Sequence, residues 1–533
     1  MTLQSRRMAS PLPTNRLPLE PRMIRFTPLP LRLAFASAAL ALALACGGGS
    51  GTGSSTPPPA ASAGPRLITP PSAQAGYRGD VVTFRVVAEG TGHGYQWFRN
   101  GTAIAGAATD SYALPVQAVD DQARFSVRVT ASTGSATTSP EALLDVLYAE
   151  PAVVAGHDHA LAITTKGKVY AWGVGGNGQL GLGDYQARLA PTAVPLPGPA
   201  VQVAAGWGHS LALLADGRVF SWGNNVSGQL GNGTTTMSNS PAAVPGLASV
   251  IYITCGYNHN LAAKADQSIW MWGYNSHGQL GQGDKTNRLS PASIPVAASQ
   301  LAVAIVAKAI EVVGSVHQQR VQLAQGHIGQ LGLPYSPTAE HLTITQLQSG
   351  GVKAARAFSL YSVFLGTDGL PYGSGENVYG QLGDGSLVTR YGWVPMNTAG
   401  LPSGTTLDSV VPGQYHTLFL GGQGAVASVG YNWYGQLGLG SATTASSVAS
   451  QSIAGLTALQ VSSGYCSSYA LLPDLSVKAW GYNNNGRLGD GTSTDRPSPT
   501  TIPGLFLGPV STGVTPPAPV AAGGLGRRGP AKG

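Results

Sequence analysis

The sequence predicts an all-β chain whose larger part is a seven-bladed β-propeller, preceded by a small β-sandwich. Two observations predict the propeller. A phrase of the form Gly-Gln-Leu-Gly recurs at nearly constant spacing through the second half of the chain, and the intervals contain short alternating apolar runs with no helical period. A period of about 50 residues is typical of propellers and solenoids. The first glycines of the seven phrases are Gly178, Gly228, Gly278, Gly329, Gly380, Gly435 and Gly486.

Each repeat unit contains about four short strands. In the second unit, the run LALLADGRVFSWG at 211–223 alternates between apolar and polar residues, and its Asp-Gly predicts a hairpin turn between two strands. A polar loop follows each Gln phrase, and then comes a short apolar strand such as VQVAAG at 201–206. Four-stranded sheets repeated radially are propeller blades. The seven units therefore predict seven blades within residues 151–513.

Two further positions recur with the phrase. A His lies 19 residues before its first glycine, and a Trp-Gly pair lies between the two. Because these residues occur once per unit, we expect them to be structural, and we predict no metal, cofactor or catalytic site from them. The histidines are His159, His209, His259 and His416, and the tryptophans are Trp172, Trp222, Trp272 and Trp480.

The stretch HSLALLADGRVFSWGNNVSGQLGNG at 209–233 closely resembles the repeats of the regulator of chromosome condensation family. The resemblance implies a seven-bladed propeller. It also implies a first blade completed by a strand from the other end of the chain. The candidate closing segments are VVAG at 153–156 and GLFLGPV at 504–510.

Some units depart from the repeat. The fourth unit departs most, because residues 300–326 lack the His, the Asp-Gly turn and the Trp-Gly although the spacing across them is normal. This stretch is either a diverged blade or a compensated frameshift. Other repeat positions for His or Trp are occupied by Tyr361, Ser374, Val429 and Ser467.

The front of the chain predicts export. Residues 33–45 are an unbroken apolar run that follows Arg25 and Arg32, too short to span a bilayer, so residues 1–45 are interpreted as a signal peptide with Met23 as the expected start. LALAC at 42–46 resembles a bacterial lipobox, which implies that Cys46 carries lipid. Ala stands where the lipobox usually has Leu, so ordinary secretion stays open. We expect a location at the cell envelope, either lipid-anchored or secreted.

Residues 46–65 are rich in Gly, Ser and Pro and predict a flexible tether. Residues 66–147 form a separate unit that resembles an immunoglobulin-like domain. Trp97 falls where such domains place a core Trp, and Asp121-x-Ala-x-Phe125 matches their corner motif. Apolar residues stand at the two positions of the usual disulfide: Val86 and Val127.

The charge distribution argues against nucleic-acid binding. The net charge is +7, but residues 1–45 contribute +5 and the tail 514–533, which we expect to be disordered, contributes +3. Residues 46–513 therefore sum to −1, and the folded part lacks the basic surface that nucleic acid requires. We expect membrane contact through the lipid anchor alone.

The function that the sequence favours is non-catalytic binding of a protein or glycan through loops on one propeller face, by a monomer. Aromatic clusters are typical binding anchors, and one such cluster comprises Tyr431, Trp433 and Tyr434. The candidate loops are 184–190, 284–290, 386–393 and 431–434. We interpret the Gly-Asp end of each phrase as a turn, because one acid per loop is too few for calcium. We expect no disulfide between Cys255 and Cys466.

Three alternatives stay open. The best-known member of the resembled family is a nuclear guanine-nucleotide exchange factor, but the spacings here leave only about five extra residues, near 396–406, for the inserted elements that such activity needs. Another branch is a secreted inhibitor of β-lactamase, so this chain could inhibit an enzyme. An envelope enzyme would require non-repeat polar residues to converge in the central channel. The partner and the binding face do not follow from the sequence.

Overall fold

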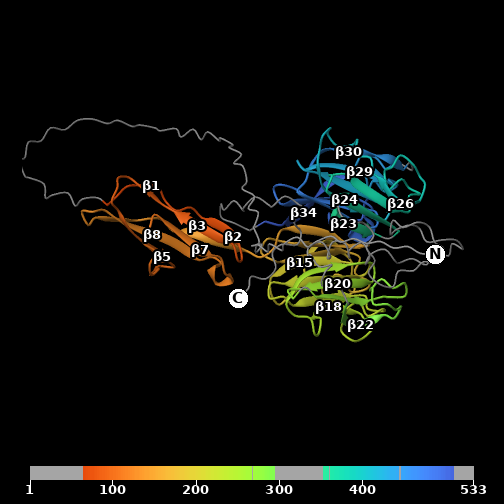
Figure 1. The fold of residues 1–533 in the computed structure, drawn as a ribbon, viewed down its shortest axis with the longest axis horizontal. Helices are drawn as coiled ribbons and strands as arrows, with labels where there is room; N and C mark the ends of the chain where they lie inside the picture. The colour runs from red at the N-terminus through yellow and green to blue at the C-terminus, as the bar shows by residue number, and fades with distance from the viewer. Residues whose placement is uncertain (1–63, 267, 295–351, 359, 443–445, 509–533) are drawn as a thin grey trace, which may run out of the picture. The chain divides into compact units, whose positions relative to one another are not determined.

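The computed structural model describes residues 64–266, 268–294, 352–358, 360–442 and 446–508 (Figure 1). Within these ranges the regular structure consists of β-strands and short 3-10 turns, so the all-β prediction is confirmed. None of the described residues belongs to a helix long and apolar enough to cross a membrane. The stretch 300–326 lies outside the described residues.

Ten strands lie between residues 67 and 147. One sheet has the order β2-β10-β8-β5-β6, with β9 paired to β8, and the pairs β3-β7 and β1-β4 complete the unit. The elements are β1 (Leu67–Thr69), β2 (Gln74–Tyr77), β3 (Val81–Arg85), β4 (Val87–Ala88), β5 (Gly94–Arg99), β6 (Thr102–Ala103), β7 (Ser111–Pro115), η1 (Ala118–Asp120), β8 (Arg124–Thr130), β9 (Ala136–Thr138) and β10 (Ala142–Leu147).

An aromatic and aliphatic core holds this unit together. Trp97 and Phe125 are fully buried, and Trp97 Nε1 donates a hydrogen bond to Thr109 O at 2.8 Å. Val86 and Val127 are both buried in the same core, so packing occupies the positions where a disulfide would lie. The immunoglobulin-like resemblance of this unit stays a prediction.

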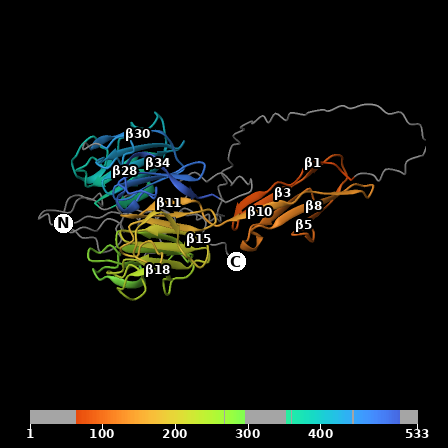
Figure 2. The same cartoon turned by 180° about the vertical axis from the view of Figure 1, so that it is seen from behind.

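Six four-stranded antiparallel sheets follow, and each corresponds to one repeat unit (Figures 1 and 2). We number the blades by repeat unit. The strands of blade four lie outside the described residues.

The blades of the first half of the ring are blade one, with β11 (Ala152–Ala155), β12 (His159–Ile163), β13 (Val169–Gly173) and β14 (Arg188–Ala193); blade two, with β15 (Ala200–Ala205), β16 (His209–Leu214), β17 (Val219–Gly223) and β18 (Ser238–Ala243); and blade three, with β19 (Val250–Cys255), β20 (His259–Lys264), β21 (Ile269–Gly273) and β22 (Arg288–Ser293).

The blades of the second half are blade five, with β23 (Val352–Phe358), β24 (Tyr361–Gly366), β25 (Pro371–Gly375) and β26 (Arg390–Pro395); blade six, with β27 (Leu407–Pro412), β28 (His416–Gly421), β29 (Ala425–Gly430) and β30 (Ser447–Thr457); and blade seven, with β31 (Gln460–Ser463), β32 (Ser467–Leu471), β33 (Ser476–Gly481) and β34 (Arg496–Phe506). The 3-10 turn η3 (Asn484–Gly486) lies between β33 and β34.

Strand order places the loops of every blade at two ends. Within each sheet, strands follow chain order and run antiparallel, so the first-to-second and third-to-fourth connections share one end. The third-to-fourth connection carries the Gly-Gln-Leu-Gly phrase. We call this end of the ring the GQLG face. The hairpins that join second and third strands lie at the opposite face.

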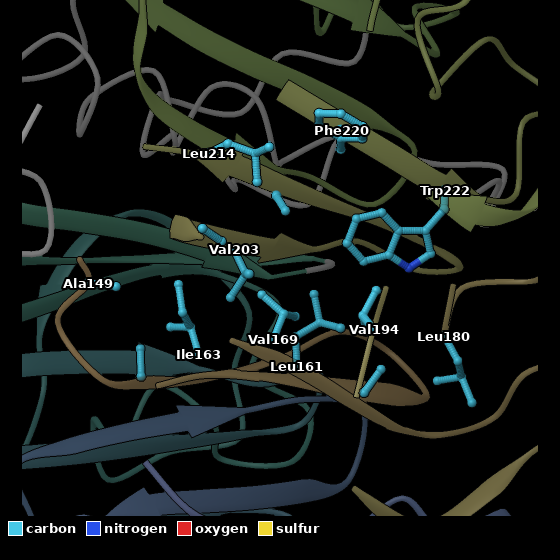
Figure 3. Packing of buried hydrophobic residues seen from close by; sticks show 14 residues of the cluster. Ala149, Leu161, Ile163, Val169, Leu180, Val194, Val203, Leu214, Phe220 and Trp222 are labelled. Atoms are coloured by element: carbon cyan, nitrogen blue, oxygen red, sulfur yellow. The ribbon is translucent and has the colours of Figure 1, made fainter. Parts of the chain in front are cut away.

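Apolar side chains fill the space between neighbouring blades. Figure 3 shows Leu161 and Val169 of blade one facing Val203 and Trp222 of blade two, and all four belong to one buried cluster. Trp222 is fully buried there. Packing between sheets of this kind is the main stabilising contribution in the ring.

Ring closure differs from the arrangement that the family resemblance implies. Blade one takes all four of its strands from one continuous segment, and so does blade seven, so the described residues 153–156 and 504–508 exchange no strand. Side-chain contacts and single backbone hydrogen bonds, such as Thr165 N to Leu507 O at 2.9 Å, join the two blades instead. For example, Val153 N donates a hydrogen bond to Gln460 Oε1 at 3.0 Å. The expectation of a completing strand from the other end was wrong, because four strands already fit within each repeat unit.

Candidate functional site

The repeat histidines lie between blades and join each one to the next. His209 is fully buried, and its Nε2 lies 2.8 Å from Asn260 Oδ1 in the following blade. Burial lowers the pKa of His159 to about 3, of His209 to about 4 and of His416 to about 3, so these rings are neutral at pH 7. Equivalent contacts to the next blade join His159 to Ser210 and His416 to Ser468, each at 2.8 Å.

Three of the four repeat tryptophans donate a hydrogen bond to the Gly-Gln-Leu-Gly phrase of the preceding blade, whereas Trp172 Nε1 has no partner among the described residues. Trp222 Nε1 and Ser210 Oγ both donate to Gln179 O, at 2.9 and 2.8 Å. Gly181 has φ of +70°, and a Cβ there would lie 2.7 Å from Trp222 Nε1, so only glycine fits beneath the indole. Trp272 donates to Gln229 O and Trp480 to Gln436 O in the same way. These contacts fix the loops of the GQLG face to the adjoining blade.

The glutamine of the phrase fixes the residue two positions before it. Gln229 Oε1 accepts a hydrogen bond from Ser227 N at 2.8 Å. Asn177, His277, Tyr379 and Tyr434 are held in the same way by the glutamines of their own phrases. This backbone bond leaves the side chain at that position free to vary between blades.

Nine half-buried aromatic side chains on the GQLG face form one connected group, which we call the aromatic rim. They come from all six described blades, and none occupies a repeat His or Trp position. The members are His157, Trp207, Tyr257, Tyr379, Tyr415, Tyr431, Tyr434, Tyr465 and Tyr482.

One part of the rim comes from loops between first and second strands, two residues before the repeat His position. The centroid of the His157 ring lies 4.6 Å from that of Tyr465 and 6.1 Å from that of Trp207. The ring of Tyr257 stacks on that of Trp207 at 5.6 Å. Trp207 N also donates to Tyr257 O at 2.9 Å, so backbone contacts between blades set the ring positions.

The other part of the rim lies on blades five to seven. The Tyr415 centroid lies 5.6 Å from that of Tyr465, 5.0 Å from that of Tyr379 and 6.0 Å from that of Tyr431. Tyr434 follows at 6.5 Å from Tyr431. Tyr482 lies 4.3 Å from Tyr434. Tilted and edge contacts of this kind are favourable for aromatic pairs.

An ion pair lies beside the rim, where blade seven meets blade one. Arg487 Nε and a terminal guanidinium nitrogen donate to Asp158 Oδ1 at 2.9 and 2.8 Å, and His157 Nδ1 lies 2.9 Å from Asp158 Oδ2. Burial raises the pKa of the Asp158 carboxyl, but its contacts with His157 and Arg487 outweigh burial and hold that pKa at about 2. The Arg487 guanidinium also lies over the Tyr482 ring, 4.6 Å from its centroid.

Four tyrosines of the rim keep their hydroxyl protons at pH 7. Burial raises the pKa of Tyr415, Tyr431, Tyr434 and Tyr465 above the ordinary value. Each neutral hydroxyl can both donate and accept a hydrogen bond. The rim therefore combines apolar ring surface with uncharged polar groups.

The structure places two of the three aromatic residues singled out from the sequence, Tyr431 and Tyr434, within the rim. Trp433 lies between them in the chain and is 54% exposed. The other seven rim residues were missed. Comparing the position two residues before the repeat His would have shown an aromatic ring at His157, Trp207, Tyr257 and Tyr465.

The other candidate loops have a different internal structure. In 184–190, Arg188 donates to Asp184 Oδ2 at 2.6 Å, and the same Asp–Arg pairing occurs in 284–290. In 386–393, Arg390 pairs with Asp384. These pairs brace turns within each loop. No group of three or more His, Cys, Asp or Glu that could hold a metal occurs among the described residues.

A cavity of about 530 Å³ is lined by the innermost strands of the six described blades. His157, Trp207 and Tyr257 lie at its lining, so the rim borders the central channel. Charged side chains from blades five and six also line it, namely Lys353, Arg356 and Asp408. The described part of the lining contains no nucleophile paired with a base. Cys255, which is also part of the lining, is a free thiol whose pKa is raised by burial.

Models of one repeat family match this chain. The Regulator of chromosome condensation (RCC1) repeat matches at residues 166–213, 216–263 and 266–310, and a second model of the same repeat matches at 152–179, 200–229 and 250–279. The matched residues cover blades one to three and continue beyond them.

Curated relatives and solved structures are similar to this chain. The Ultraviolet-B receptor UVR8 of Arabidopsis thaliana is 31% identical over 34% of this chain and 41% of its own length. The human Regulator of chromosome condensation is 32% identical over 30% of this chain and 38% of its own. Each match thus spans less than half of the relative. The crystal structure of human WBSCR16 aligns over 68% of this chain and 85% of that chain, with 22% identity and a TM-score of 0.39.

Proposed function

Because the chain contains regulator of chromosome condensation repeats, we propose that its propeller is a non-catalytic binding module at the cell envelope, with the aromatic rim as its docking surface for a protein or glycan. Repeats of this kind supply a rigid ring and leave the loop positions free to vary. The specificity of each such ring then depends on its own loop residues.

The observation that carries the proposal is the continuous rim of nine aromatic side chains. Other blades place Val174 and Asn224 at the position held by Tyr431 and Tyr482, so the fold does not require a ring there. Large aromatic side chains that are half-exposed and clustered are typical anchors of binding surfaces. Trp433 extends the same surface outward from blade six.

The composition of the face favours binding over catalysis. A catalytic site requires unlike reactive groups that converge on one point. On the rim, the acid nearest to His157 is Asp158, and this carboxylate is already held by Arg487. The remaining rim members are neutral aromatic rings.

The envelope location rests on the sequence pattern of the front of the chain. Signal peptide 1–45, lipidated Cys46, tether 46–65 and the sandwich unit 66–147 would together hold the propeller away from a membrane. Mass spectrometry of the mature N-terminus tests this part of the proposal, and we expect an acylated Cys46. An intact N-terminus in protein from fractionated cells would overturn the envelope location.

Sedimentation of the purified full-length protein with isolated cell envelopes tests the rim. We expect saturable binding, and we expect the double change Trp433→Ala with Tyr434→Ala to weaken it at least tenfold. Phe506→Ala is the matched control, since Phe506 is 49% exposed and pairs with Ser476 near the opposite face. Equal binding by all three proteins would refute the rim as docking surface.

A further inference from the structure

We propose that the rim contains a subsite for one uncharged sugar residue between blades six and seven, built around the amides of Gln436 and Gln414. This inference rests on the proposed function and specifies the ligand class as a neutral glycan. Two buried amide groups, each left without part of its hydrogen bonding, point to it.

In blades two and five, the amide nitrogen of the phrase glutamine has a hydrogen-bond partner on the GQLG face. Gln229 Nε2 donates to Asn224 Oδ1 at 2.8 Å and lies 3.3 Å from Asn258 Oδ1 in the next blade. Gln381 Nε2 donates to Glu376 Oε2 at 3.4 Å. The partner positions are the residue after Trp-Gly in the same blade and the residue before the repeat His in the next.

Blade six differs from blades two and five. Its two partner positions hold Tyr431 and Cys466, and no hydrogen bond joins either side chain to the Gln436 amide nitrogen. Gln436 is fully buried, and its Nε2 has no hydrogen-bond partner in the described part of the chain. Its Oε1 accepts from Tyr434 N at 3.0 Å, so the side chain is held in place and its free donor has a fixed orientation.

The second amide lies in the adjoining loop. Gln414 occupies the position that holds His157, Trp207, Tyr257 or Tyr465 in other blades, and it is 4% exposed. Gln414 Nε2 donates to the Tyr415 hydroxyl at 3.0 Å, whereas Oε1 has no partner among the described residues. Blade six thus presents one free buried acceptor beside Tyr415 and one free buried donor beside Tyr434.

Buried polar atoms without partners are rare, because each one loses its hydrogen bond to water on folding. A ligand hydroxyl can bond to the free amide donor and also to the free amide acceptor, since it donates through its hydrogen and accepts through its lone pairs. Tyr415, Tyr431, Tyr434 and Tyr465 are in ring contact with one another, and two of them are bonded to the amides, since the Tyr415 hydroxyl accepts from Gln414 Nε2 and Tyr434 N donates to Gln436 Oε1. A pyranose combines these features, because its hydroxyls lie at its edge and its C–H bonds form an apolar face.

The charges of the face favour a neutral ligand. Asp158 and Arg487 compensate each other, burial raises the pKa of Glu376, and Asp495, whose charge acts on Tyr434 and Cys466, already accepts a hydrogen bond from Asn483 N. An ionised sugar would therefore lose its hydration without gaining an opposite charge at the subsite.

Binding of defined hexasaccharides to the full-length protein, measured by isothermal titration calorimetry, tests the subsite. The neutral probes are cellohexaose, maltohexaose, mannohexaose and N-acetylchitohexaose, and the charged probes are hexagalacturonate and chitosan hexamer. We expect at least one neutral probe to bind, and both charged probes to bind at least tenfold more weakly than it does.

Gln436→Glu is the sharpest variant, because it keeps the acceptor for Tyr434 N and removes the free donor. We expect it to weaken the neutral probe at least tenfold. Gln451→Glu is the matched control, since Gln451 is exposed on an outer strand of the same blade. Gln414→Met, which removes the free acceptor without adding charge, should also weaken binding tenfold, with thermal unfolding confirming that each variant is folded.

The results separate this inference from the proposed function. Envelope binding that depends on Trp433 and Tyr434, without binding of any neutral hexasaccharide, would overturn the sugar subsite and leave the rim as a protein-binding surface. Unchanged binding by folded Gln436→Glu and Gln414→Met would also overturn it. If the wild-type protein binds neither cell envelopes nor any hexasaccharide, both proposals are rejected.

Discussion

The first three blades and the last three blades come from the same repeat, but their aromatic residues lie in different places. Blades one to three keep His and Trp at every repeat position, between the sheets. Blades five to seven replace four of these six residues, with Tyr361, Ser374, Val429 and Ser467, yet they supply six of the nine rim residues. The propeller therefore tolerates the loss of single contacts between blades. The half of the ring in which these contacts are lost carries most of the docking surface.

The largest expected difference between the halves is in acid stability. The folded pKa values of about 3, 4 and 3 for His159, His209 and His416 lie below the unfolded value near 6.5. The unfolded chain therefore takes up protons first, and stability is lost as pH falls below about 6.5. Three such groups amount to roughly 5–8 kcal/mol by pH 4.5.

Thermal unfolding between pH 7 and pH 4.5 measures this loss. His209→Gln should flatten the dependence, and His93→Gln, at a half-buried position in the sandwich unit, serves as control. A pH dependence that is identical in His209→Gln and in the wild type would contradict the assignment.

The second test compares interblade packing in the two halves. Trp222→Ala should cost about 3–5 kcal/mol, because the fully buried indole and its bond to Gln179 O are lost. Val429→Ala, at the same repeat position in blade six, should cost only about 1–2 kcal/mol. Urea unfolding measures both. Equal losses of unfolding free energy would show that the Trp positions of the first half do not stabilise the propeller more than the corresponding positions of the second half.

The third test concerns the seam between the halves. Arg487 stands where the other phrases have Gln, and Arg487→Gln would leave Asp158 without its cation. We expect a loss of about 2 kcal/mol at pH 7, and Asp158→Asn in the same chain should restore most of it. The folded pKa of Asp158 is below its unfolded value, so this contribution is present above about pH 4 and lost as pH falls toward 2. A loss that persists at pH 2.5 would exclude the ion pair as its cause.

The smallest expected effect comes from comparing a tyrosine buried at a repeat position with a tyrosine of the rim. Tyr361 fills a repeat His position, and its hydroxyl donates to His416 O at 2.7 Å, so Tyr361→Phe should cost about 1 kcal/mol. Tyr482→Phe, on the rim, should cost less than about 0.5 kcal/mol. Chemical denaturation resolves the two values, and a reversed order would mean that the rim contributes to stability.

The sequence predicted the strands and turns of the blades well, because they repeat from one unit to the next. Asp-Gly turns, alternating runs and the phrase period are local signals, and they were sufficient for the blade pattern. The absence of strand exchange was not visible, because an apolar segment such as 153–156 reads the same whether it pairs with its own blade or with another.

The rim was predicted only where its members are neighbours in the chain, as at Tyr431 and Tyr434. His157 and Tyr465 are 4.6 Å apart in space but come from opposite ends of the repeat array, so only ring closure brings them together. The free amide donor of Gln436 was even harder to predict from the sequence. Every phrase glutamine has the same neighbours in the motif, and its partner depends on the residue after Trp-Gly in its own blade and the residue before the repeat His of the next blade.

Closure without an exchanged strand makes each of the six described blades a self-contained segment of the chain. A tandem duplication or deletion of one repeat would add or remove an entire sheet and leave every other sheet with its own four strands. The interfaces between neighbours could then be re-formed from the same His, Trp and phrase contacts, and only the seam of Asp158 and Arg487 is particular to its place. In this architecture the number of blades and the sequence of the rim can change independently.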